Sequence, residues 1–163
     1  ETVKTVLERL DIPLIVKEVG QGMGPKSLKA LLQLPLVAVE FAAGGGTNFA
    51  KLELLRSSAA NQALFEGVAN LGHTAEQMVH WCNQLMDELG DKVKTQNLII
   101  SGGVKDYMDG YYLTELSEMP AIYGQASGFL RHAQGEYAVL QQHIAAQIRG
   151  LELANAFLVI SGE

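Results

Sequence analysis

The fold of this chain is decided by the stretch LIISGGVK, residues 98–105. It is a short apolar run that ends in two glycines, and Asp106 and a helical pattern follow it. A strand that ends at Ser-Gly-Gly leaves consecutive backbone N–H groups unobstructed by side chains, and the positive end of the next helix points the same way. The stretch therefore predicts a strand–turn–helix unit whose turn binds an anion such as a phosphate.

A second unit of the same kind follows, with the sequence AIYGQASG at residues 121–128. It again joins an apolar run to small residues and a helix. Two adjacent units that offer amides to one phosphate are the arrangement found after the last two strands of many (β/α)8 barrels. A glycine pair alone is more often only a tight turn, and the paired spacing is what favours a phosphate site.

Strands and helices alternate along the rest of the chain. Apolar runs predict buried parallel strands at residues 13–19, 35–42, 97–101 and 120–124. Helical spacing predicts helices at residues 1–10, 27–34, 49–58, 74–89, 107–117 and 135–157. The last of these carries an apolar stripe made of Tyr137, Leu140, Ile144, Ile148 and Leu151. Residues 59–72 show no clear pattern.

This order predicts an α/β fold with a parallel sheet and right-handed crossovers. Four strand–helix units form either an open doubly wound sheet or half of a (β/α)8 TIM barrel. The loop GQGMGP at residues 20–25 lacks the Gly-x-Gly-x-x-Gly spacing of dinucleotide-binding sheets, which favours the barrel. We expect one domain over residues 1–163 that is a piece of a longer chain, because the first helix opens without a cap.

Composition narrows the class of protein. The net charge is −6 over 163 residues, so neither nucleic acid nor a membrane surface is an expected partner. The apolar runs are of strand length, and no signal peptide opens the chain. Cys82 is the single cysteine, which excludes an internal disulfide and favours a cytoplasmic location. Beside Trp81, it is expected to be a packing residue.

Two places carry candidate binding residues. Lys17 and Glu18 end an apolar strand, where charged groups need a partner or a ligand. Either they pair with neighbours, or Lys17 presents its ammonium to an electron-rich ligand such as a flavin. The triple glycine at residues 44–46 is either a flexible loop or a close-approach site beside the donor Thr47.

Other polar residues are assigned structural roles. The four histidines are expected at the surface or in interfaces, because none has metal-ligand spacing. Asp106 and Asp109 are expected to cap a helix. No catalytic residue and no metal ligand is assigned in this chain.

Four segments together carry a resemblance to a known family: IVKEVG at residues 15–20, AGGGT at 43–47, ISGGV at 100–104 and YGQASGFL at 123–130. In order and spacing they resemble the type 2 isopentenyl diphosphate isomerases, which are FMN-dependent (β/α)8-barrel enzymes of isoprenoid biosynthesis. The resemblance covers nearly the whole chain. It implies that the chain is the carboxyl-terminal half of the barrel, with strands five to eight.

The resemblance also implies residue roles. Lys17 would meet the isoalloxazine ring, and Thr47 would bind FMN. The FMN phosphate would be held by backbone amides of Gly102, Gly103, Val104, Ala126 and Ser127. The family usually has serine at Ala42, so one FMN contact departs from its pattern. Residues 59–73 lack its tryptophan-containing segment, so the substrate-side wall departs from the pattern as well.

Isopentenyl and dimethylallyl diphosphate are the substrates that the resemblance implies, with Mg2+ as their counterion and NADPH as the reductant of FMN. The residues for substrate and Mg2+ lie in the first half of the barrel and have no match here. The chain alone is therefore expected to be inactive. Its unpaired strand edge would pair with the missing amino-terminal half or form a homo-oligomer.

Two other functions stay open. One is a different FMN barrel, such as a 2-hydroxy acid oxidase, although that class needs a histidine and an arginine where this chain has residues 104–106, VKD. The other is a half-barrel module that binds flavin or phosphate without catalysis.

Overall fold

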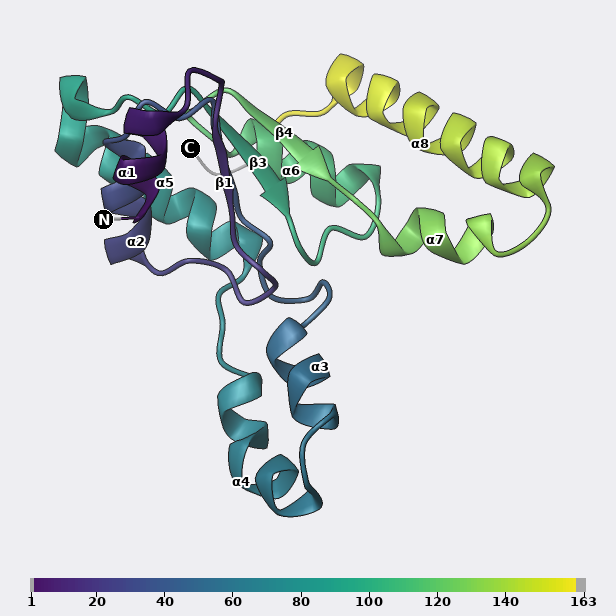
Figure 1. The fold of residues 1–163 in the computed structure, drawn as a ribbon. Helices are drawn as coiled ribbons and strands as arrows, with labels where there is room; N and C mark the ends of the chain where they lie inside the picture. The colour runs from purple at the N-terminus through teal and green to yellow at the C-terminus, as the bar shows by residue number, and fades with distance from the viewer. Residues whose placement is uncertain (1, 161–163) are drawn as a thin grey trace.

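The computed structural model describes residues 2–160, and within them the strands form a parallel four-stranded sheet. Figure 1 shows how the helices lie around it. The strand order is β1-β2-β3-β4, so strands that follow one another in sequence are also neighbours in the sheet. The strands are β1 (Ile15–Lys17), β2 (Ala38–Glu40), β3 (Asn97–Ser101) and β4 (Ala121–Gly124). The predicted α/β class and parallel sheet are confirmed.

Helices follow every strand. They are α1 (Thr2–Arg9), α2 (Pro25–Leu32), α3 (Phe49–Leu55), α4 (Ala59–Ala69), α5 (Ala75–Leu89), α6 (Tyr107–Glu115), α7 (Ser127–Ala133) and α8 (Tyr137–Phe157), with a 3-10 turn η1 (Gly90–Lys92). The segment without a clear pattern thus contains α4. Residue 1 of the first expected helix and residues 161–163 of the expected domain lie outside the described residues.

The core lies between one face of the sheet and helices α2 and α5. Its largest fully buried side chains include Leu28 and Leu32 of α2, Met78 of α5 and Phe41 after β2. Each such side chain contributes about 1.5–3 kcal/mol by leaving water. Helix α5 has the predicted ends, with a capping box between Thr74 and Gln77 at its start and Gly90 at its end.

The other face of the sheet has little cover, which corrects one expectation. The strand at residues 13–19 was expected to be buried on both faces, but Ile15 is 49% exposed and Val19 is 62% exposed. On β4, Ile122 of the same face is 64% exposed. Only β2 pairs with β1, and the outer strands of this face expose apolar side chains. Strand periodicity reports which residues share a face, and it does not report whether a second layer covers them.

The apolar stripe expected on the last helix is not the face that packs against the rest of the protein. Tyr137 is 70% exposed and Ile148 is 54% exposed. The residues of α8 that are buried are Gly150 and Ala154. A Cβ on Gly150 would lie 2.4 Å from the ring of Tyr107, so α8 contacts α6 through its small residues.

Helices α3 and α4 extend away from the sheet as a pair (Figure 1). They expose apolar side chains, including Leu55 at 62% and Leu64 at 71%. None of the helices in the described range combines the length and hydropathy needed to span a bilayer.

Candidate functional site

The candidate site lies at the edge of the sheet where the four strands end. The turns after β2 and β3 meet there, backbone against backbone. A Cβ on Gly102 would lie 2.1 Å from the carbonyl oxygen of Ala43, and one on Gly45 would lie 2.9 Å from the Cα of Gly103. Gly102 and Gly103 also have φ angles of 91° and 78°, which favour glycine. Both turns therefore need their glycines.

Unpaired amides gather at the turns after β3 and β4. The register pairs Ser101 with Gly124, so the two turns start side by side. Helix α7 begins without a side-chain cap. Within residues 2–160, no hydrogen bond is donated by the amides predicted to hold a phosphate, those of Gly102, Gly103, Val104, Ala126 and Ser127. These amides are donors that a bound anion can satisfy.

The amides at the start of α6 are occupied, unlike those at the start of α7. The carboxylate of Asp106 accepts hydrogen bonds from the amides of Met108 and Asp109, at 2.9 and 3.2 Å. The amide of Tyr107 donates to Gln147 at 2.8 Å. The predicted capping role of Asp106 is confirmed. The positive end of α6 is therefore not free for an anion, and α7 is the helix that offers amides.

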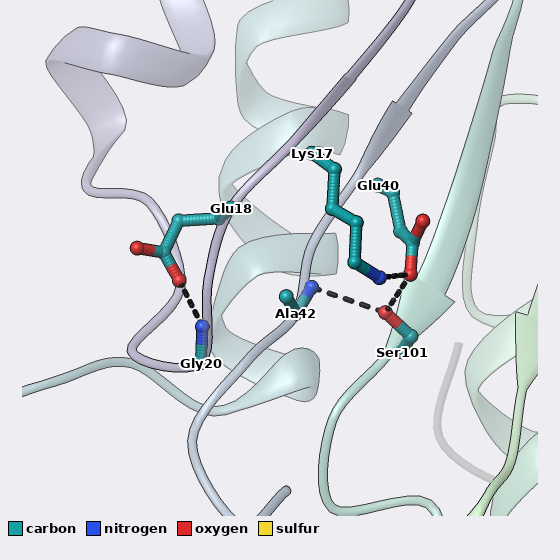
Figure 2. A network of polar contacts seen from close by, with 6 residues as sticks. All are labelled: Lys17, Glu18, Gly20, Glu40, Ala42 and Ser101. Carbon is teal, nitrogen blue, oxygen red and sulfur yellow. Dashed lines mark hydrogen bonds and ion pairs between the residues drawn. The ribbon is translucent and has the colours of Figure 1, made fainter. Parts of the chain in front are cut away.

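A polar network crosses three strands on the open face of the sheet (Figure 2). Lys17 and Glu40 are directly opposite in the register of β1 and β2, and the Lys17 ammonium forms an ion pair with Glu40 Oε1. The same oxygen accepts a hydrogen bond from the Ser101 hydroxyl at 3.0 Å. Ser101 Oγ in turn accepts from the amide of Ala42 at 3.1 Å.

Of the two alternatives expected for Lys17, the structure shows the ion pair with a neighbour, Glu40. The Lys17 side chain is 56% exposed and that of Glu40 is 19% exposed, so the ammonium keeps an accessible side. Sequence analysis missed Glu40 and Ser101. The signal for Glu40 was an acidic residue inside an apolar run, LVAVEFA at residues 36–42.

Glu18 has a structural role in the loop that follows β1. Its Oε2 accepts hydrogen bonds from the amides of Gly20, Gln21 and Gly22 at 2.6, 2.7 and 2.9 Å. Burial raises the pKa of Glu18, but backbone hydrogen bonds outweigh that effect, and the net pKa is lowered. Glu18 is therefore an ionised anchor for the glycine loop.

Thr47 lies on the exposed loop after β2. Its carbonyl oxygen would be 2.0 Å from a Cβ on Gly20, so the loops after β1 and β2 are in contact. Its hydroxyl forms no hydrogen bond to any residue that the structure describes. Asn48, the next residue, caps α3 by accepting from the amide of Lys51 at 2.8 Å. Thr47 is thus placed beside the site with a free donor.

The histidines and Cys82 show no arrangement for catalysis or metal binding, although the backbone of His73 bonds to Gln21 and Gly44 of the loops after β1 and β2. His132 and His143 stack at 4.1 Å between ring centroids on α7 and α8, and His73 contacts Trp81 at 4.8 Å. Burial raises the pKa of the Cys82 thiol to about 12, which excludes a reactive thiolate at neutral pH. The described part of the chain contains no cluster of three or more His, Cys, Asp or Glu side chains that could hold a metal ion.

Curated relatives match almost the whole chain. It is 28% identical over 156 residues to the isopentenyl-diphosphate delta-isomerase of Stutzerimonas stutzeri (strain A1501), covering 94% of this chain and 42% of that protein. It is 27% identical over 154 residues to the enzyme of the same name from Rickettsia africae (strain ESF-5), covering 93% of this chain and 42% of that protein. The chain thus spans less than half the length of these relatives. No protein-family model matches it.

These relatives correct the assignment made from the motifs. Their names specify isopentenyl-diphosphate delta-isomerase without a type, and 42% of their length is matched. The narrower assignment, to the carboxyl-terminal half of a type 2 enzyme, is not supported and is replaced by similarity to part of an isopentenyl-diphosphate delta-isomerase. Short glycine turns occur in many proteins that bring backbone amides to a phosphate, so these motifs alone do not identify the type of isomerase.

Proposed function

We propose that residues 1–163 form half of a (β/α)8 barrel within an isopentenyl-diphosphate delta-isomerase of isoprenoid biosynthesis. The similarity to enzymes of that name over 93–94% of the chain supports the activity. The parallel order of the sheet and the exposed Ile15 and Ile122 on one face support the half-barrel, because closing a barrel would bury that face. The reaction would interconvert isopentenyl and dimethylallyl diphosphate.

The cofactor that we propose for this edge of the sheet is FMN. The unpaired amides of the turns after β3 and β4 fit its phosphate, and the exposed side of the Lys17 ammonium fits the electron-rich edge of its ring. Thr47 offers one further donor. Bound flavin would supply the acid and base chemistry for moving a proton on the substrate.

The residues of this chain would then position and stabilise the flavin. Backbone amides of the glycine turns would neutralise phosphate charge without any side chain that must be ordered on binding. Lys17 would stabilise negative charge on the ring. NADPH as reductant, Mg2+ at the substrate diphosphate, a cytoplasmic location and a homo-oligomer are proposals for the whole protein. This chain alone would be inactive, because we assign it no substrate or Mg2+ residue.

The flavin proposal depends on the unpaired amides of two adjacent turns. Comparing a flavin with a phosphate to one without it tests whether these amides bind the phosphate. FMN and riboflavin differ only in that phosphate, so the full-length protein should bind FMN at least tenfold more tightly, since one charge-assisted hydrogen bond contributes about 1.5–3 kcal/mol. The affinities can be measured from the change in flavin absorbance. Equal affinities would exclude a phosphate site at these turns.

A charge placed at the turn gives a second test. Ser127 is exposed at the start of α7, where an added carboxylate favours the helix and repels a phosphate. S127D should weaken FMN binding about tenfold and leave riboflavin binding unchanged. S127A is the matched control, because it keeps the amide and adds no charge. A loss of both ligands in S127D, or of neither, would contradict the proposed placement.

A further inference from the structure

Glu40 is less exposed than its partner Lys17, at 19% against 56%, and its carboxylate has two partners (Figure 2). One carboxylate oxygen binds both the Lys17 ammonium and the Ser101 hydroxyl. Three strands are thereby linked at one atom, Oε1, with β2 in the centre. Such a carboxylate is held in one orientation, whereas the aliphatic stem of a lysine is flexible on its own.

The Lys17 ammonium has three N–H donors, and the ion pair uses one of them. The other two remain for a ligand on the exposed side. Without Glu40, the half-exposed lysine side chain would sample many rotamers in water, and holding it against a ligand would then cost about 1–2 kcal/mol of conformational entropy.

We propose that Glu40 is a positioning residue that holds the Lys17 ammonium at the carboxyl edge of the sheet, ready to contact the ring of a bound flavin. This inference rests on the proposed flavin site. It assigns a role to a residue that the sequence motifs did not single out, and it gives Ser101 the task of fixing Glu40.

The direction in which the flavin midpoint potential shifts distinguishes a positioning role of Glu40 from a purely electrostatic one. Removing a negative charge near a flavin should by itself favour the reduced, more negative flavin. Loss of a positioning residue should do the opposite, because the ammonium that stabilises reduced flavin is no longer held in place. The readout is therefore the ratio of affinities for reduced and oxidised FMN, obtained from the midpoint potential of the bound flavin in the full-length protein.

We expect K17M to lower this ratio about tenfold, which corresponds to about 30 mV for a two-electron couple. E40A should lower it about threefold to tenfold, and the double variant should match K17M, because Glu40 acts through Lys17. E40Q keeps an acceptor oxygen and should not fall below the wild-type ratio. S101A should lower the ratio about twofold. It replaces E40A as the test variant if E40A does not fold.

E88A is the matched control, because Glu88 forms the same kind of ion pair with Lys29 between α2 and α5. It should leave the ratio unchanged. An unchanged or raised ratio in E40A, or additive effects with K17M, would overturn the role of Glu40 while the flavin site stands. A wild-type protein that binds no FMN would overturn the proposed cofactor and this inference together.

Discussion

Replacing Gly102 with alanine tests whether the contact between the two glycine turns holds the site together. At φ 91°, an L side chain is strained, at a cost of about 1–2 kcal/mol. Its Cβ would also lie 2.1 Å from the carbonyl oxygen and 2.3 Å from the amide nitrogen of Ala43. Those atoms are backbone, and the Ala43 amide donates to the carbonyl oxygen of Ser101 at 2.8 Å.

The two turns must therefore separate in G102A. Losing the hydrogen bond from Ala43 adds about 1 kcal/mol to the strain, so the free energy of unfolding should fall by about 2–3 kcal/mol. Urea unfolding followed by far-UV circular dichroism measures this change.

The matched control is G67A. Gly67 lies inside α4, and a Cβ there would meet nothing within 4 Å. Alanine in a helix is more favourable than glycine by about 0.5–1 kcal/mol, so G67A should stabilise the protein slightly. If G102A were as stable as the wild type while G67A behaved as expected, the close contact between the turns would be wrong.

Two further predictions concern single residues around the loops. Ala42 has a φ of 42°, so A42G should relieve left-handed strain of about 1–2 kcal/mol at an entropic cost of about 0.5–1 kcal/mol. The midpoint of urea unfolding should therefore rise, and a lower midpoint would contradict the strain. The lowered pKa of Glu18 means that its carboxylate stabilises the fold above the ordinary pKa of 4.5, and that this contribution is lost as pH falls through the lowered value. E18Q should cost about 1 kcal/mol at pH 7 and progressively less as the pH falls below 4.5, and a loss that does not change with pH would refute the assigned charge.

Elements with local signals were predictable from the sequence. The strand expected at residues 97–101 coincides with β3, because a short apolar run that ends at Gly-Gly is typical of a strand. The ends of α5 followed from Thr74 and Gly90, since caps act through neighbouring backbone groups. Helix α4 was not predicted, because its residues are largely exposed and no packed face imposes a pattern.

The polar network of the site was less accessible to sequence reasoning. Its contacts join Lys17, Glu40 and Ser101, which are far apart in the chain and meet through the register of the strands. Lys17 stood out because a charge ends an apolar strand, but its partner could not be chosen without that register. Likewise, the exposure of β1 depends on what covers the sheet, and no residue of the strand encodes it.

The meeting of the glycine turns has a mechanical consequence. At Gly102 and Gly45 the two turns meet through main-chain atoms, so a rotamer change at those positions cannot alter their spacing. A ligand held by the turn after β3 would thus restrain the loop after β2 as well, and the two loops would move together as one rigid unit.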